Sequence, residues 1–127
     1  MDLSIASWWG PETNLDRARL TLLMDRTIQF NSPLKWTIYH EDERDLQPSV
    51  EVLRSDFEYL KKWFAWHPAW AHVDGRPVLF VFNGEGCDTV DRWMTASNGE
   101  WYIVLKLFPE FQKCPSQPDS WVSIAIV

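Results

Sequence analysis

The sequence predicts an α/β fold made of parallel β/α units, amounting to about half of a (β/α)8 TIM-type barrel. Four apolar, strand-like segments alternate with three helical segments, and strict alternation of this kind is typical of a parallel sheet with right-handed crossovers. No glycine-rich phosphate-binding turn follows a predicted strand, so nucleotide-binding folds have no support. A complete barrel needs about 250 residues, whereas this chain has 127.

The first predicted strand, residues 2–8, is an apolar run that ends at a Gly-Pro pair, which interrupts regular structure. A helix is expected over residues 13–31, because an N-cap residue with a carboxylate three positions later precedes an apolar stripe. A Ser-Pro pair ends this helix. The second strand, residues 34–40, alternates apolar and polar side chains and runs into a charged loop at residues 41–45.

The second helix, residues 48–64, has the clearest pattern, because apolar side chains spaced three and four apart lie on one face. An Asp-Gly turn at residues 73–76 precedes a continuous apolar run, residues 77–82. Such a run is typical of a strand buried on both faces of a parallel sheet. A short helix over residues 88–97 and a fourth strand over residues 101–107 complete the alternation.

Both ends of the chain resemble the interior of a larger fold. The chain begins directly on a strand, and after a polar loop at residues 110–120 it finishes in an apolar run, residues 121–127, without a turn signal. We therefore expect residues 1–127 to be a single partial barrel domain. An open half barrel also leaves its strand edges unpaired, so self-association through those edges is one expectation.

Composition and charge exclude several classes of partner. The chain has 18 acidic and 12 basic side chains, a net charge of −6, and no Lys/Arg cluster, which disfavours nucleic acid and anionic membrane surfaces. It has no apolar stretch of membrane-spanning length and no signal-peptide pattern. Cys87 and Cys114 are too few for a cysteine zinc site, and no metal or other cofactor is expected. Spacing alone leaves open whether these two cysteines form a disulfide.

Aromatic and acidic side chains gather where the four predicted strands end, which is where parallel α/β folds place their sites. The four groups are Trp8, Trp9 and Glu12; His40, Glu41, Asp42 and Glu43; Asn83, Glu85 and Cys87; and Phe108, Pro109, Glu110, Phe111 and Cys114. Indole faces cover the apolar faces of a sugar ring, while carboxylates bind its hydroxyls and supply acid or base chemistry. Carbohydrate is therefore the favoured ligand.

Nine tryptophans are an unusually large number for this length. Most lie inside predicted elements or beneath the link after the second helix, and these are assigned to packing: Trp36, Trp63, Trp93, Trp101, Trp66 and Trp70. Only Trp8 and Trp9 lie where a sugar platform is expected.

The charged loop after the second strand has an ordinary interpretation beside the functional one. Glu43 and Asp45 fit a solvated loop, whereas Glu41, directly at the strand exit, fits a site and a surface position equally well. His40 points to the opposite side of an extended strand from Glu41. A single histidine there is either a structural hydrogen-bond partner or part of the site.

Three segments, in order, resemble the barrel of glycoside hydrolase family 99 and the related family 71: Ser7-Trp8-Trp9-Gly10-Pro11, Tyr39-His40-Glu41, and the Asp-Gly-Arg-Pro-Val turn and strand over residues 73–81. The resemblance implies a (β/α)8 barrel and a retaining endo-acting mannosidase or mannanase that needs no metal and works through a 1,2-anhydro sugar. It implies that Glu41 is the base that acts on the sugar 2-hydroxyl. Full-length relatives with this resemblance include secreted proteins, so the compartment stays open.

Two departures from the family pattern bear on activity. Asp42 stands where the family has proline after its catalytic carboxylate, and the Asn-Glu-Trp-like motif that supplies the general acid is absent from the sequence. Since hydrolysis needs both groups, the sequence leaves open whether this chain is an enzyme. The expected site consists of Glu41 as the catalytic base and of substrate-binding Trp8, Trp9, Tyr39, His40, Asn83 and Glu110.

Two alternatives remain beside a glycan-processing hydrolase fragment. One is a noncatalytic carbohydrate-binding relative that keeps the Trp8 and Trp9 platform. The other is a structural or interaction module that pairs through its open sheet edges.

Overall fold

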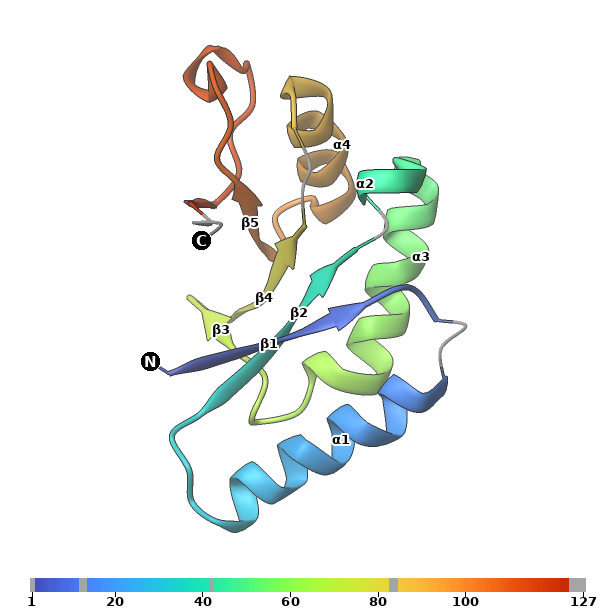
Figure 1. The fold of residues 1–127 in the computed structure, drawn as a ribbon, viewed down its shortest axis with the longest axis vertical. Coiled ribbons are helices and arrows are strands. Elements are labelled where there is room, and N and C mark those ends of the chain that lie inside the picture. The colour runs from blue at the N-terminus through green and yellow to red at the C-terminus, as the bar shows by residue number, and fades with distance from the viewer. Residues whose placement is uncertain (1, 12–13, 42, 83–84, 124–127) are drawn as a thin grey trace.

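A computed structural model describes residues 2–11, 14–41, 43–82 and 85–123 of the chain (Figure 1). Its elements are β1 (Leu3–Trp8), α1 (Asn14–Gln29), β2 (Lys35–His40), α2 (Glu43–Leu46), α3 (Val50–Leu60), the π-helical segment η1 (Lys61–Ala65), β3 (His72–Val73), β4 (Arg76–Val81), α4 (Cys87–Ser97), β5 (Tyr102–Lys106), the 3-10 turn η2 (Phe111–Lys113) and β6 (Ser120–Val122). The predicted alternation of strands and helices is confirmed.

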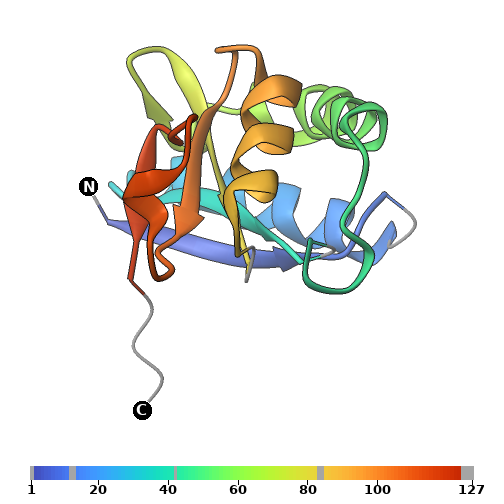
Figure 2. The same ribbon diagram turned by 90° about the horizontal axis from the view of Figure 1, so that it is seen from above.

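The strands form one sheet in the order β1-β2-β4-β5-β6, and every pair along this path is parallel. The helices α1, α3 and α4 lie on the same side of the sheet (Figures 1 and 2). One covered and one uncovered face is the arrangement of a barrel wall, in which helices surround the outside. The predicted fold class, β/α units forming part of a TIM-type barrel, is therefore confirmed.

The structure has two strands that the sequence did not predict. β3 pairs with β4 in an antiparallel hairpin, whose turn residues Asp74 and Gly75 have φ values of 52° and 75°. Positive φ at both central positions is what a tight hairpin turn requires, which explains the Asp-Gly pair. β6 comes from the end of the predicted polar loop and the start of the final apolar run.

Long-range contacts hold β6 in place. One Asp119 carboxylate oxygen lies 3.0 Å from Arg76 Nη1, and the other accepts a hydrogen bond of 2.9 Å from the backbone N–H of Ile103. The Trp121 ring lies 5.7 Å from the ring of Phe108 and 5.0 Å from that of Phe111. The strand is thus fixed by partners from β4, β5 and the loop after β5, in addition to the strand preference of its own Trp121 and Val122.

The main core lies between the sheet and the helices. Apolar side chains from α1, α3, η1, α4 and the covered sheet face form it, with the largest fully buried members being Trp8, Trp70, Trp93, Phe64, Met24, Ile38, Leu53, Leu60, Leu79, Ile103 and Leu105. The burial of Leu53, Phe57 and Leu60 on α3 follows the three-and-four spacing of the sequence.

The uncovered sheet face carries a second, smaller cluster. Ala71, Val78, Phe80 and Val104 are buried there, and partly buried side chains surround them: Leu3, Ile5, Tyr39, Val73, Tyr102 and Val122. The two clusters contain alternate residues of the same strands, as the side-chain period of a strand requires. This confirms the prediction that the strand at residues 77–82 is apolar on both sides.

All but one of the tryptophans assigned to packing are buried or partly buried. Trp93, Trp101 and Trp70 are buried and Trp63 is partly buried, in agreement with their assignment to packing. The prediction for Trp66 was wrong, because its side chain is 65% exposed. The chain reverses direction just after η1, and that reversal turns Trp66 outward while His67 is buried in its place.

Cys87 and Cys114 form a disulfide with their Cα atoms 5.0 Å apart. Cys87 is the first residue of α4, after the end of β4, and Cys114 follows η2, after the end of β5. The bond therefore ties together two segments that follow neighbouring strands. Among the residues that the structure describes, no helix is long and apolar enough to cross a bilayer.

Loss of the disulfide is expected to lower the free energy of unfolding by about 3 kcal/mol, because the bond closes a loop of 27 residues in the unfolded chain. Urea denaturation of Cys87→Ser/Cys114→Ser against the wild type measures this difference. Wild-type protein treated with a reductant is the matched control and should behave like the double variant. Equal midpoints for the oxidised and reduced wild type would contradict the bond's stabilising role.

Candidate functional site

The carboxyl ends of four strands lie side by side and define the carboxyl edge of the sheet. Trp8 pairs with His40, His40 with Val81, and Val81 with Leu105. The segments that leave these strands therefore begin next to one another. This register brings the groups expected at the first, second and fourth strand exits to one edge, as predicted for a parallel sheet.

His40 faces the helices. Its side chain is fully buried, with its ring 5.3 Å from that of Trp8 and 4.8 Å from that of Trp93. Its Nε2 lies 2.8 Å from Asp56 Oδ2 on α3, and its Nδ1 has no hydrogen-bond partner among the described residues. The Asp56 contact is that of a structural hydrogen-bond partner, and it fastens the end of β2 to α3.

Glu41 lies on the opposite side of β2 from His40, as the strand alternation predicts. Its backbone N–H donates a 3.0 Å hydrogen bond to the Trp8 carbonyl, so the pairing of β1 and β2 continues to this residue. Its side chain is only 7% exposed. No described residue donates a hydrogen bond to its carboxylate, which leaves the oxygens available to a ligand hydroxyl.

Tyr39 shares the Glu41 side of β2 and responds to its charge. Burial raises the pKa of the Tyr39 phenol above its usual value of 10.0, and the negative charge of Glu41 raises it further. The rings of Phe80 and Phe82 lie 5.5 and 5.9 Å away in edge-to-face contact. The phenol therefore stays protonated and able to donate a hydrogen bond beside a carboxylate, with apolar rings around it.

Glu43 is the best-held carboxylate at the carboxyl edge. Its two oxygens lie 2.8 and 2.6 Å from Arg92 Nη1 and Nη2, and Trp93 Nε1–H donates to it at 2.7 Å. These hydrogen bonds raise the pKa of Arg92 above its usual value. The expectation of a solvated Glu43 was wrong, because α2 folds it against α4, where it is only 2% exposed. Glu43 thus anchors the chain two residues beyond Glu41.

Trp8 and Trp9 take different positions. Trp8 is 2% exposed and its ring stacks on that of Tyr59 at 5.9 Å, so it packs in the core and supports the end of β1 with no free indole face. Trp9 follows β1 and is 50% exposed. Of the two, Trp9 has the accessibility that a sugar platform requires.

Glu110 lies further along the carboxyl edge, in the loop after β5. Its carboxylate is exposed and lies 3.1 Å from Lys113 Nζ. It lines a hollow of about 390 Å³ together with the rings of Phe108 and Phe111. Nothing ties this hollow to Glu41 directly. Asn83, the remaining predicted substrate contact, lies outside the described residues, as do Glu12 and Asp42.

Lys106 is a polar residue at this edge that the sequence interpretation missed. It is the last residue of β5, on the uncovered sheet face by alternation with Tyr102 and Val104, and its Nζ lies 3.8 Å from Glu85 Oε1. The signal was present, since a lysine ends an otherwise apolar strand. Its partner could not be foreseen, because Glu85 follows a different strand.

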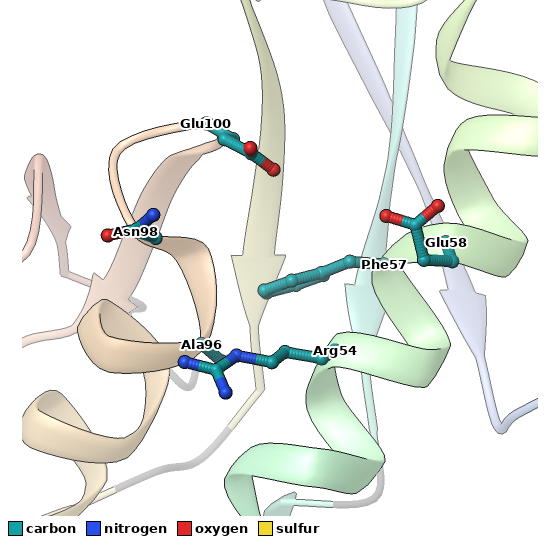
Figure 3. Close-up of a pocket in the computed structure, with 6 residues that line it drawn as sticks. All are labelled: Arg54, Phe57, Glu58, Ala96, Asn98 and Glu100. Atoms are coloured by element: carbon teal, nitrogen blue, oxygen red, sulfur yellow. The ribbon is translucent and has the colours of Figure 1, made fainter.

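A separate hollow of about 240 Å³ lies between α3 and α4 (Figure 3). Its lining comes from the two helices and from the segment before β5: Arg54, Phe57, Glu58, Ala96, Asn98 and Glu100. Because α4 ends beside this hollow, it lies toward the amino ends of the strands, away from Glu41. Within the described part of the chain no three His, Cys, Asp or Glu side chains are grouped to hold a metal ion.

No protein-family model matches the sequence, and no curated protein matches it. The structure is similar to that of the family 99 endo-alpha-mannosidase from Bacteroides thetaiotaomicron, solved with bis-tris-propane, with a TM-score of 0.58 and 15% sequence identity. The match covers 95% of this chain and 40% of the enzyme's chain, so the chain spans two fifths of that enzyme's length. This distant likeness shows a family-99-like fold.

Glu41→Gln is expected to lower the Tyr39 pKa, because it removes the negative charge that adds to the effect of burial. Titration of ¹³C-labelled tyrosine by NMR measures this value, with Tyr39→Phe assigning the resonance. In the wild type the unfolding free energy should fall as pH rises from about 10, since the folded protein still holds a proton that the unfolded chain has lost. An unchanged Tyr39 pKa in Glu41→Gln would show that the two groups are not neighbours.

Glu43→Gln is expected to lower the unfolding free energy by about 3 kcal/mol, because Arg92 would keep its charge in a mostly buried position with only the exposed Asp88 left as a counter-ion. Urea denaturation measures the change. Glu51→Gln on the exposed side of α3 is the matched control and should change stability by less than about 0.5 kcal/mol. Similar effects of the two variants would refute the anchoring role of Glu43.

Proposed function

We propose that this chain binds an α-mannose-containing glycan at the carboxyl edge of its sheet, as part of a retaining endo-mannosidase-type glycoside hydrolase. The observation that carries the proposal is the Glu41 carboxylate. It is buried at the end of β2, beside a protonated Tyr39 and clear of hydrogen bonds from the described residues. The likeness to the endo-alpha-mannosidase supports the glycan class, and the motif around Glu41 supports its role.

Five of the seven expected residues have a place in this proposal. Trp9 supplies the exposed indole face on which a sugar ring stacks. Tyr39 donates a hydrogen bond from its phenol, and Glu41 accepts one from a sugar hydroxyl. Trp8 and His40 have an indirect role, because they hold the ends of the strands that carry Trp9 and Glu41. The two rings pack together, and His40 contacts Asp56.

In the chemistry that the resemblance implies, Glu41 takes the proton from the sugar 2-hydroxyl as that oxygen attacks the anomeric carbon. The bond to the leaving group breaks, and a general acid protonates the departing oxygen. Water then attacks the anomeric carbon and opens the 1,2-anhydro ring with a second inversion, while Glu41 returns its proton to the sugar 2-oxygen, so the configuration is retained overall. The Asn-Glu-Trp-like motif of the general acid does not occur in residues 1–127. Cleavage therefore requires a second carboxyl group, outside that motif, to act as the general acid.

A second candidate function is noncatalytic carbohydrate binding by the same edge. The exposed Trp9 and the buried Glu41 suffice for recognition without an acid. The sheet ends at β1 and β6, and no further strand pairs with these two among the described residues, which favours a third role as an interaction module that pairs with another chain through its sheet edges.

Glycan binding is expected to weaken about tenfold or more in Glu41→Gln and in Trp9→Ala, since the first loses a charged acceptor and the second a stacking surface. Isothermal titration calorimetry with an α-linked mannose oligosaccharide measures the affinities. Glu100→Gln, exposed in the segment before β5 and away from the edge, is the control that should bind like the wild type.

Unchanged binding in both variants would refute the carbohydrate site. If the site binds but a longer gene product that contains it cleaves no α-mannan, the noncatalytic alternative replaces the hydrolase. If no glycan binds and sedimentation shows a dimer, the interaction module is the function.

A further inference from the structure

A groove outside the carboxyl edge is lined by tryptophan side chains. It runs between α1 and η1, has a volume of about 530 Å³, and is lined by Arg17, Ala18, Thr21, Leu22, Asp25, Lys62, Trp63 and Trp66. η1 directly follows the end of α3, and α3 starts near the carboxyl edge, so η1, which forms one wall of the groove, lies toward the other end of the helix layer (Figure 1). None of the residues expected at the sugar site lines it.

From these features we infer that the groove is a second carbohydrate-binding surface, which takes a neutral oligosaccharide. Trp66 carries the inference, because 65% of its side chain is exposed although an indole of this size is ordinarily packed. Its ring lies 5.5 Å from that of the buried His67, at an interplanar angle of 46°. An exposed indole held by a buried neighbour is a preformed stacking surface.

The backbone that carries these tryptophans is itself unusual. Lys61–Ala65 is a π-helical segment directly after the α-helical part of α3. Such segments are rare and are found frequently at functional sites, because the wider turn changes the direction of the side chains that follow it. In this segment Phe64 and Ala65 are buried, whereas Trp63 and the following Trp66 line the groove.

The polar side chains of the groove match the hydroxyls of a neutral sugar. Arg17 and Lys62 are donors, and the Arg17 guanidinium stacks on the Trp63 ring at 4.2 Å. Asp25 is an acceptor, and one of its oxygens already holds His67 at 2.8 Å while its side chain is 62% exposed. A sugar hydroxyl donates and accepts, so a set with both signs suits it better than it suits an anion or a cation.

The test uses a background in which the carboxyl-edge site is disabled, Trp9→Ala/Glu41→Gln. Affinity electrophoresis in gels that contain soluble α-mannan measures retardation, and the Trp66 indole N–H resonance, assigned with Trp66→Phe, reports local binding. We expect retardation to persist in this background and to fall about three- to tenfold when Trp66→Ala is added. Trp66→Tyr should restore most of it, since it keeps an aromatic face.

Phe30→Ala is the matched control, because Phe30 is a 71% exposed aromatic that does not line the groove. It should leave retardation unchanged. Because Trp66 is mostly exposed, circular dichroism is expected to show an intact fold in Trp66→Ala.

The choice of α-mannan rests on the proposed function, but the outcomes separate the two. If disabling the carboxyl edge removes all binding, the groove inference is wrong and the proposed function stands. If only Trp66→Ala removes binding, the groove is confirmed and the carboxyl-edge site is refuted. Absence of binding in every protein overturns both, and a Trp66 effect on sedimentation without retardation assigns the groove to a protein contact and overturns the inference.

Discussion

The carboxyl edge depends on the hydrogen bonds that the buried Glu43 carboxylate accepts. Arg92 and Trp93 of α4 hold it with three hydrogen bonds of 2.8, 2.6 and 2.7 Å. A carboxylate at such a depth is stable only when its partners satisfy it, and its loss would leave Arg92 charged and nearly buried. By joining α2 to α4, it fixes the start of α2, two residues beyond Glu41. The polar network is therefore a structural element of this edge.

The two faces of the sheet have different surroundings, as the side chains of β2 illustrate. His40 points toward the helices and contacts Asp56, whereas Tyr39 and Glu41 point to the side that no helix covers. Adjacent residues of a strand are thus divided between the two faces of the sheet. The disulfide between Cys87 and Cys114 adds a covalent constraint at the same edge. The proposed ligand-binding residues therefore lie on strands that packing and covalent bonding both hold.

Much of the fold and part of the site could be predicted from local patterns. The apolar runs of the four main strands and the spacing on α3 identify their elements directly, since each pattern reflects burial on one or two faces. β6 was missed although Trp121 and Val122 favour a strand, because Asp119 joins this segment to the sheet through Arg76 and Ile103, which lie far away in the sequence. The position of Glu41 followed from its strand, but the burial of Trp8 and Glu43 and the exposure of Trp66 did not. Those depend on which neighbours the folded chain supplies.

The sequence by itself determined the alternation of strands and helices, the parallel sheet and the edge at which its strands end. Periodicity and turn chemistry are local properties, and they act before any distant contact forms. Only the tertiary structure decided which of several similar side chains are accessible. Trp8 and Trp9 are adjacent in the chain, yet Trp8 is packed in the core and Trp9 is half exposed. Glu41 and Glu43 are both buried, but Glu43 is held by Arg92 and Trp93, whereas no described residue donates a hydrogen bond to the Glu41 carboxylate. These differences depend on long-range neighbours that a local pattern does not encode.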